Sequence, residues 1–432
     1  MIKQVPVIVL ALAATALVAQ SPVHENDVIV VLHPDATLES SPRVDALTQR
    51  ARNQERALGV AAEHGLAAQQ SYGTVLKGFS TRANANQVAA LREDPRVARV
   101  MNDGVAYGRP KPGSGSPPAQ VVPWGIARIG ADTVSNTGAG IHVYVLDSGI
   151  DSNHPDLQAN IDTNGWAGYT CKGSGSVCVY PWDDDYGHGT HIAGTIGAID
   201  DGDYVVGVAP EVTLHPVKVL AKSNSGAWSI IAGGIDWAAA DMAARGEVAV
   251  ANLSIGGSGT KDGECTTSGY TGSHILYEAL CNARNMGMIV AIAAGNSGND
   301  AATEIPAAYD DVGIIVSATL EGDDWIDWSN WGDDTATWTT HASAPVTIAA
   351  PGVSVLSTMN DGGLASWSGT SMATPHVAGA VALWLVNNPQ SLDSSAFFNA
   401  RAALLNAAED TSGFSNTSGH PHAEPFLDVR GF

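Results

Sequence analysis

The chain has 432 residues, of which 44% are hydrophobic and 15% charged, and its formal net charge is −23. This composition excludes a disordered chain and allows a large buried core. Residues 1–118 hold 12 Lys/Arg and 10 Asp/Glu, whereas residues 119–432 hold 9 and 34. Because nucleic-acid binding needs a basic face, we expect no nucleic-acid partner. We also expect the chain to work as a monomer.

The first twenty residues form a segment of their own. The stretch MIKQVPVIVLALAATALVAQ combines an early Lys3 with an apolar run over 5–19 and small residues near its end. This pattern is typical of a secretory signal peptide, and the run is too short to span a bilayer comfortably. A short membrane anchor is the alternative. We predict a signal peptide at residues 1–20 and a secreted protein.

A small α/β domain that ends in a linker is predicted for residues 21–118. Alternating apolar residues predict strands, and apolar residues three or four apart predict helices. The predicted elements are strands at 27–32, 71–83 and 95–103 and helices at 43–64 and 84–94. The stretch 108–120, rich in Pro, Gly and Ser, then indicates a domain boundary.

A larger α/β domain is predicted for residues 119–432. Near-continuous apolar runs are typical of parallel strands that are buried on both faces. The runs lie at 141–146, 212–220, 248–255 and 288–294, and helical segments at 191–199, 227–245 and 274–286 separate them. This alternation predicts a doubly wound, mostly parallel sheet covered by helices.

Four cysteines allow two disulfides in an exported chain. They are Cys171, Cys178, Cys265 and Cys281, and three pairings are possible. We favour Cys171–Cys178 and Cys265–Cys281 because both bridges close local loops. A zinc site made of all four lacks the usual short paired spacing.

Three polar residues fall at strand ends or helix starts, where α/β folds place their chemistry. Asp147 ends the run VYVLD, His188 stands in DYGHGTHIAGT, and Ser371 begins the apolar segment SMATPHVAGAVALWLV. A histidine can take the proton of a serine hydroxyl near neutral pH and so make it a nucleophile. An aspartate can hold the imidazole in the required tautomer. The set predicts acyl transfer through Ser371.

Acyl transfer also needs donors for a developing oxyanion. The backbone N–H of Ser371, at a helix start, is one candidate, and the side-chain amide of Asn296 in IAAGNSG is the second. Taken singly, each residue has a structural alternative: an Asx turn or cap for Asp147, an N-cap for Ser371, a structural role for His188 and a turn for Asn296.

Four sequence blocks together resemble the subtilisin-like serine proteases. They are DSGI at 147–150, HGTHIAGT at 188–195, AAGNSG at 293–298 and GTSMATPHVAG at 369–379. The chain order Asp, His, Ser is also that of subtilisin. The resemblance implies a serine endopeptidase that hydrolyses proteins or peptides through an acyl-enzyme, with Asn296 as the oxyanion amide.

The resemblance also implies how an extended substrate is held. Two segments would flank it and pair with its backbone: Ser254, Ile255 and Gly256 in ANLSIGG, and Ser225, Gly226 and Ala227 in SNSGAWS. Ordinary strand ends with glycine turns are the alternative. Glu304 falls at the wall or base of the primary specificity pocket. An inward Glu304 would favour Lys or Arg before the cleaved bond, whereas an outward one would simply be solvated.

Residues 76–100 are similar to the inhibitory propeptides of these proteases. The resemblance implies that residues 21–118 fold beside the catalytic domain, block its cleft and are removed by self-processing at a bond within 103–120. The charge contrast between the two parts would favour this docking. An unrelated stable domain is the alternative. The predicted organisation is a signal peptide at 1–20, a propeptide with linker at 21–118 and a catalytic domain at 119–432.

A structural calcium ion is also implied by the resemblance, since AQVVPWG at 119–125 is similar to the mature N-terminus of subtilisins. Side-chain oxygens would come from Gln120, Asp156 and Asp201, and backbone carbonyls from Ile199, Asp203 and Val205. Six oxygens that include two carboxylates suit calcium. A solvated acidic loop is the alternative.

Two rival functions remain for the chain as a whole. A catalytically inactive homologue would only bind peptides or surfaces, and the complete set with Asn296 argues against it. A sedolisin-type acid peptidase would use a Glu base and an Asp oxyanion residue, whereas this chain has His188 and Asn296.

Overall fold

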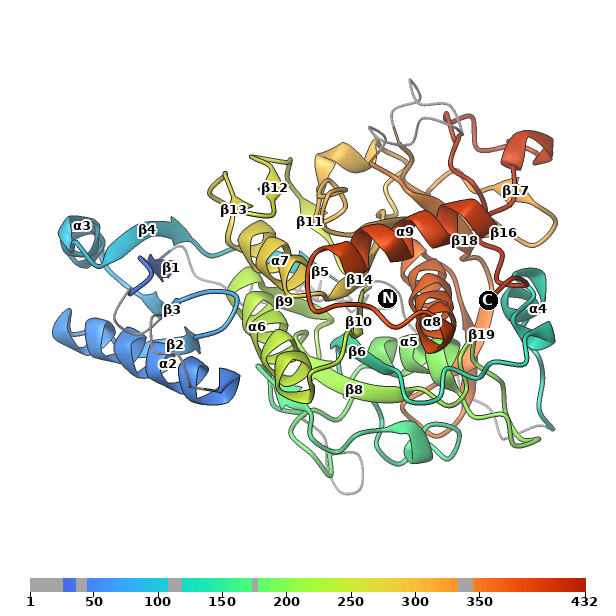
Figure 1. The fold of residues 1–432 in the computed structure, drawn as a ribbon, viewed down its shortest axis with the longest axis horizontal. Coiled ribbons are helices and arrows are strands. Elements are labelled where there is room, and N and C mark those ends of the chain that lie inside the picture. The colour runs from blue at the N-terminus through green and yellow to red at the C-terminus, as the bar shows by residue number, and fades with distance from the viewer. Residues whose placement is uncertain (1–25, 36–44, 108–118, 173–177, 333–344) are drawn as a thin grey trace, which may run out of the picture.

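The computed structural model describes residues 26–35, 45–107, 119–172, 178–332 and 345–432. Figure 1 shows a small domain, drawn in blue, beside a larger domain drawn from green to red. The predicted signal peptide at 1–20 and residues 108–118 of the predicted linker lie outside the described residues. Within those described ranges, no helix has the length and apolar character needed to cross a membrane.

The small domain is a four-stranded antiparallel sheet with two helices. Its strands are β1 (Asp27–Leu32), β2 (Ala68–Tyr72), β3 (Gly78–Arg82) and β4 (Val97–Asn102), in the order β2-β3-β1-β4, and its helices are α2 (Ala46–Glu63) and α3 (Ala85–Glu93). Every residue of β1 is buried. Asn84 and Gln87 form a capping box that fixes the start of α3. The elements predicted at 27–32, 84–94 and 95–103 are confirmed to within two residues at each end.

One predicted strand of this domain is wrong. The structure divides the strand expected at 71–83 into β2 and β3, and the residues between them form a loop. The backbone amides of that loop bind a carboxylate of the larger domain instead of a neighbouring strand. The alternating sequence did not reveal this partner because it lies more than 150 residues further along the chain.

The larger domain is built on a sheet that is parallel except at one edge. The strands are β6 (His142–Asp147), β7 (Trp166–Ala167), β8 (Thr213–Lys218), β10 (Val250–Leu253), β14 (Ile289–Ala293), β16 (Ile314–Leu320), β17 (Asp324–Trp325) and β18 (Ile348–Pro351). Their order is β17-β16-β14-β10-β6-β8-β7, with β18 also paired to β16, and only β17 is antiparallel to its neighbour. The four predicted strands are confirmed, and the doubly wound, mostly parallel fold with them.

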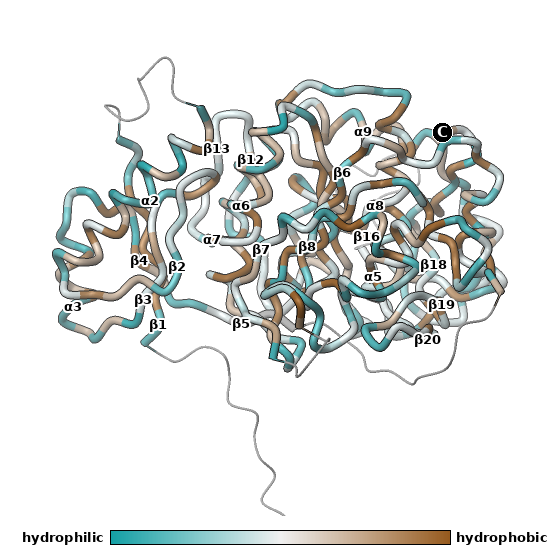
Figure 2. Tube along the Cα trace, turned by 90° about the horizontal axis from the view of Figure 1, so that it is seen from below, coloured by the Kyte–Doolittle hydropathy of each residue, from teal (hydrophilic) through white to brown (hydrophobic). Residues whose placement is uncertain are grey.

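Helices cover both faces of this sheet. On one face lie α5 (His188–Gly197), α8 (Thr370–Asn387) and α9 (Ser395–Ala407), and on the other α6 (Trp228–Arg245) and α7 (Ile275–Asn285). Figure 2 shows the hydrophobic residues gathered in the interior around β6, β8 and β16. Each fully buried Val, Leu or Ile stabilises such a core by about 1.5–3 kcal/mol. Figure 1 shows α6 and α7 between the sheet and the small domain.

Short elements complete the chain. They are the helix α4 (Trp124–Arg128) and the antiparallel pairs β5 (Val105–Tyr107) with β9 (Ser225–Ala227), β11 (Gly257–Ser258) with β15 (Glu304–Ile305), β12 (Cys265–Thr266) with β13 (Gly269–Tyr270), and β19 (Val355–Thr358) with β20 (Leu364–Trp367). The pair β5–β9 joins the two domains.

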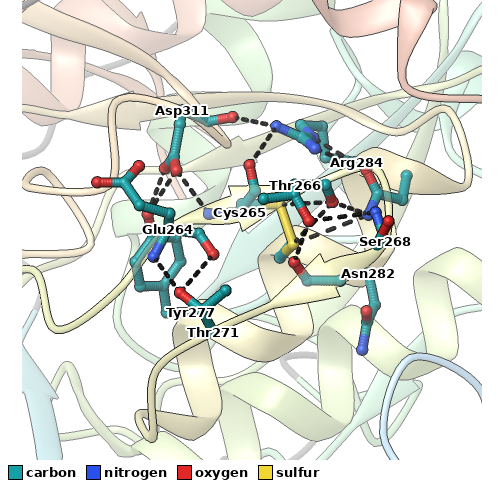
Figure 3. The surroundings of a disulfide bond; sticks show 12 residues. Glu264, Cys265, Thr266, Ser268, Thr271, Tyr277, Asn282, Arg284 and Asp311 are labelled. Carbon is teal, nitrogen blue, oxygen red and sulfur yellow. Dashed lines mark hydrogen bonds between the residues drawn. A yellow bond between two sulfur atoms is a disulfide. The ribbon is translucent and has the colours of Figure 1, made fainter.

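Both favoured disulfides are present. Cys171 is bonded to Cys178 and Cys265 to Cys281, and the described residues include no free cysteine. Figure 3 shows the second bridge, which ties β12 to α7, with Asp311 beside it. The Asp311 carboxylate accepts hydrogen bonds from the Cys265 N–H (2.8 Å) and the Tyr277 hydroxyl (2.5 Å). The loop that carries β12 is therefore anchored at several points.

The topology fixes where a site can form. Within the sheet, β8 is the neighbour of β6 in one direction, and β10, which comes later in the chain, is its neighbour in the other direction. Such a reversal leaves a crevice outside the carboxyl ends of the two flanking strands. Asp147 is the last residue of β6, and Ser254 directly follows β10.

Candidate active site

Asp147 and His188 form a buried pair at this crevice. Asp147 ends β6 and His188 begins α5, and Asp147 Oδ1 lies 2.8 Å from His188 Nδ1. Both side chains are fully buried. The Ser148 N–H also donates to Asp147 Oδ1 (2.7 Å). The carboxylate can therefore hold the ring with Nδ1 protonated, which leaves Nε2 as its basic atom.

The start of α5 is held by Asp184, a residue that our sequence reasoning passed over. Its carboxylate accepts from the N–H groups of Gly187 (2.8 Å) and Thr190 (2.9 Å) and from the Ser148 hydroxyl (2.8 Å). Gly187 is left-handed, with φ 115°. Asp184 thus positions both the turn before His188 and the residue after Asp147. The run DDD before the histidine block was the available signal.

Further acidic groups lie behind this pair. The buried Lys218 ammonium donates to Asp185 Oδ1 (2.6 Å) and to the Ser148 carbonyl. Among the described residues, no Lys or Arg forms an ion pair with Asp151. Its burial, with the Asp183 and Asp184 carboxylates adding to the effect, raises the pKa of Asp151 to about 6. The site therefore combines one carboxylate that is compensated by a cation with one whose pKa is raised well above its usual range.

Ser371 is the second residue of α8 and is almost fully buried. Its hydroxyl donates to the Ser254 carbonyl (3.2 Å), and its own carbonyl accepts from the Ser254 hydroxyl (3.0 Å). These contacts join the start of α8 to the carboxyl end of β10. The first N–H groups of a helix have no partner within that helix, so those at Ser371 are available to an anion.

Asn296 follows β14 and is oriented by one neighbour. Its Oδ1 accepts from the Thr370 N–H (2.8 Å) and the Thr370 hydroxyl (2.9 Å). Since the oxygen is occupied, Nδ2 is the atom left to donate to a ligand. Asn296 and Ser371 both line one cavity of about 500 Å³.

Four of the predicted substrate-binding residues, Ser254, Ile255, Gly256 and Glu304, line this cavity. The described lining residues are Gly104, Trp228, Ser254, Ile255, Gly256, Gly257, Ser258, Ala293, Gly295, Asn296, Ser297, Glu304, Thr370 and Ser371. Glu304 therefore faces this cavity. The other predicted segment, Ser225 to Ala227, is the strand β9.

The strand β9 is paired with the end of the small domain. Val105 lies opposite Ala227 and Tyr107 opposite Ser225, in antiparallel register. The Trp228 N–H donates to the Gly104 carbonyl (2.9 Å), which extends the ladder by one bond. The chain segment at 104–107 therefore occupies β9 in the way that an extended peptide adds a strand to a sheet edge.

Two carboxylates fasten the domains on either side of this ladder. Asp236, fully buried within α6, accepts from the N–H groups of Thr74 (2.5 Å) and Val75 (2.7 Å) and pairs with Arg50 (3.2 Å). In return, Asp103 accepts from the N–H (3.0 Å) and hydroxyl of Ser229 in the first turn of α6. Asp236, a lone acid within the apolar segment AWSIIAGGIDWAAA, was a signal that our sequence reasoning did not use.

The predicted calcium ligands lie together beside the chain that follows the linker. Gln120 donates to the Ile199 carbonyl (3.4 Å) and accepts from the Gly202 N–H (3.1 Å). Asp156 Oδ2 accepts from the Val205 N–H (3.2 Å), whereas Oδ1 is buried with no hydrogen-bond partner. Burial is the main cause that raises the pKa of Asp156 to about 7, and the Asp201 and Asp203 carboxylates add to it.

An orphaned carboxylate oxygen beside other carboxylates fits a cation. Calcium binding would require the Gln120 amide to turn, so that its oxygen and not its nitrogen lies beside the Ile199 carbonyl. Over the described ranges, no three His, Cys, Asp or Glu side chains gather as a metal centre of those groups alone. The predicted set depends instead on two carboxylates with amide and carbonyl oxygens.

Comparison with known proteins finds relatives along most of the chain. A model of the Subtilase family matches residues 138–421, and a model of Peptidase inhibitor I9 matches residues 27–107. Subtilisin E of Bacillus subtilis is 35% identical over 348 residues, or 79% of each chain. Subtilisin of Bacillus pumilus is 38% identical over 277 residues, or 63% of this chain and 87% of that protein.

A solved structure is similar as well. It is described as the crystal structure of a cold adapted subtilisin-like serine proteinase, and it aligns with a TM-score of 0.55 at 31% identity. The alignment covers 71% of this chain and 98% of that chain. The matched ranges and the structural likeness agree with the two-part fold described above.

Proposed function

Because the chain belongs to the subtilase family, we propose that Asp147, His188 and Ser371 are its catalytic triad and that Asn296 is its oxyanion amide. Membership makes the protein a subtilisin-like serine endopeptidase with an inhibitory I9 propeptide. The observation that carries the triad is the buried 2.8 Å contact of Asp147 with His188 at the sheet edge that also bears Ser371.

The proposed reaction begins when the Ser371 hydroxyl turns from the Ser254 carbonyl toward His188 Nε2. Ser371 Oγ attacks the substrate carbonyl, and Nε2 takes the hydroxyl proton. Asn296 Nδ2 and the Ser371 N–H stabilise the oxyanion. Nε2 then gives the proton to the leaving amine, and the acyl-enzyme forms. In the second half of the reaction, water attacks the acyl carbonyl and His188 Nε2 takes a proton from it. Nε2 then gives that proton to Ser371 Oγ as the ester bond breaks, which releases the acid and restores the hydroxyl.

Self-processing is the second part of the proposal. Residues 105–107 pair with β9. The first bond to be cut should therefore lie on the C-terminal side of Tyr107, within the predicted range 103–120. Before the cut the propeptide would be an intramolecular inhibitor, and the resulting fragment would stay bound without a covalent link because it occupies a predicted substrate strand. The predicted boundaries, 1–20, 21–118 and 119–432, and the status of the protein as a secreted monomer without a nucleic-acid partner belong to this proposal.

A calcium ion at the Gln120 loop is the third part. Side chains of Gln120, Asp156 and Asp201 would bind it, with carbonyls of Ile199, Asp203 and Val205. The Val121 N–H donates to the Tyr204 carbonyl (2.9 Å), so the two segments already lie side by side. When bound, the ion would supply a charged cross-link between them.

A peptide-amide assay tests the proposed function. The parent enzyme should hydrolyse a chromogenic peptide amide. A serine-directed covalent inhibitor should modify Ser371 and abolish this activity. Ser371→Ala is the matched control and should be inactive. A parent protein that folds, binds peptides and releases no product would instead be the inactive homologue.

A further inference from the structure

Glu304 is the one charged side chain among the described residues that line the cavity beside Ser371. The remaining lining residues are small, hydroxylic, amide or apolar. Glycine and alanine along the walls leave room for the long aliphatic stem of a substrate side chain. The charged group at the far end of such a stem would then meet the carboxylate.

The carboxylate lies between the two walls of the cavity. Glu304 is opposite Ser258 in the β11–β15 pair, so its backbone is fixed. A Cβ placed on Gly256 would lie 3.5 Å from Glu304 Oε2, and one placed on Gly295 would lie 2.3 Å from it. Gly295, with φ 108°, therefore makes space for the carboxylate and also has a backbone that favours glycine.

In the part of the chain that the structure describes, this carboxylate has no cationic partner. Its Oε1 accepts one hydrogen bond, from the Ser297 hydroxyl (2.7 Å), and within the described ranges no Lys or Arg forms an ion pair with it. Glu304 is half-buried. A carboxylate that is partly shielded from water and paired only with a hydroxyl attracts a cation more strongly than one at the open surface.

We propose that Glu304 makes the enzyme prefer substrates with Lys or Arg immediately before the cleaved bond. The inference rests on the proposed function, because the residue before the cleaved bond is the one whose carbonyl Ser371 attacks. Ser371 and Asn296, which would hold that carbonyl, line the same cavity as Glu304. The side chain of the residue that carries the carbonyl therefore enters the cavity and reaches the carboxylate.

The test compares peptide amides that differ only in the residue before the cleaved bond: Arg, its neutral isostere citrulline, and Phe. In the parent, kcat/KM should be higher for Arg than for citrulline. Glu304→Gln should lower the Arg/citrulline ratio about 10- to 100-fold and leave the Phe value nearly unchanged. Both substrates are measured on one preparation, so the ratio does not depend on how much enzyme has matured.

Three controls sharpen the result. Glu304→Asp keeps the charge and should keep part of the preference for Arg. Glu247→Gln removes one charge at the opposite, amino end of β10 and should leave the ratio unchanged. Raising the salt from about 0.1 M to about 1 M shortens the screening length from about 10 Å to about 3 Å, and it should reduce the ratio in the parent but not in Glu304→Gln.

The outcomes separate the two claims. If the parent cleaves the Arg and citrulline substrates equally well, or if Glu304→Gln keeps the ratio of the parent, the inference about Glu304 is wrong while the peptidase assignment stands. If the parent cleaves none of the three and a serine-directed inhibitor does not label Ser371, the proposed function itself is wrong.

Discussion

At the scale of single residues, Asn296 is fixed by a contact that decides its role. Thr370 occupies Oδ1, and so the amide can only donate into the cavity. We expect Asn296→Ala to fold and to lower kcat by about 100- to 1,000-fold, the range already measured for the corresponding donor in subtilisin. KM should change little, because the bond to the oxyanion strengthens only in the transition state.

The measurement is a comparison of kcat and KM for one peptide amide. Thr370→Val is a useful companion, since it removes the hydroxyl that orients Asn296 but keeps the donating amide. It should give a smaller loss than Asn296→Ala. An Asn296→Ala enzyme with the kcat of the parent would show that another group stabilises the oxyanion.

Asp151 should make the stability of the fold depend on pH. Its pKa is raised to about 6 by burial and by nearby carboxylates. A carboxyl group with a higher pKa in the folded state stabilises the fold below its unfolded pKa of about 4, and this contribution is lost as the pH rises through about 6. Asp151→Asn stays neutral at every pH. It should therefore gain up to about 3 kcal/mol in unfolding free energy over the parent above pH 7, and little below pH 4.

Unfolding of both proteins in the Ser371→Ala background, where self-digestion is absent, would measure this gain across the pH range. Asp410→Asn is the control, because Asp410 accepts from an N–H two residues ahead as Asp151 does, but at the surface. A gain at Asp151 that is equal at low and high pH would contradict the linkage argument.

At the scale of elements, the Gln120 loop should respond to calcium. A ligand that binds only the folded state adds about 2.7 kcal/mol at a hundredfold excess over its dissociation constant. We expect chelation to lower the unfolding temperature of the parent, and Asp201→Ala to weaken this dependence. Asp200→Ala, an exposed neighbour outside the proposed ligand set, should behave as the parent does. Equal protection of the parent and Asp201→Ala by excess calcium would remove the loop from the site.

The elements also show what a sequence can and cannot predict. The buried strands β6, β8, β10 and β14 were predictable because each is a near-continuous apolar run between helices. The strand β16 is equally buried, but no helix of the expected kind separates it from β14, and we did not predict it. The division between β2 and β3 depends on Asp236, which is remote in the chain.

The candidate site was also predictable where its residues belong to a local sequence pattern, and not where they depend on tertiary contacts. Candidate residues that stand in recurrent blocks, such as His188 and Ser371, could be named from the sequence. Asp103 acts through a backbone N–H of α6, which is remote in the chain, and no local pattern reports such a contact. Asp184 accepts from an N–H only three residues ahead, and the run DDD was a signal for it that we did not use. The inward direction of Glu304 depends on its pairing with β11, which is also a tertiary fact.

At the scale of the whole molecule, Ser371 should be needed for maturation as well as for hydrolysis. We expect Ser371→Ala, made in a host without other proteases, to fold and to remain one chain that retains the small domain. Mass spectrometry and N-terminal sequencing would check this, with purified parent enzyme added afterwards to show that the linker can be cut. If the variant matures unaided to the N-terminus of the parent, another protease performs the cleavage.

The two carboxylates that join the domains lose their partners together when the small domain leaves. Asp236 then faces water, and the first turn of α6 loses the acceptor that Asp103 supplied. Neither contact is covalent, so a cut in the linker does not by itself start the enzyme. The fragment rebinds by mass action until dilution or digestion removes it. A fresh preparation should therefore show a delay before full activity, and the delay should shorten when the preparation is diluted.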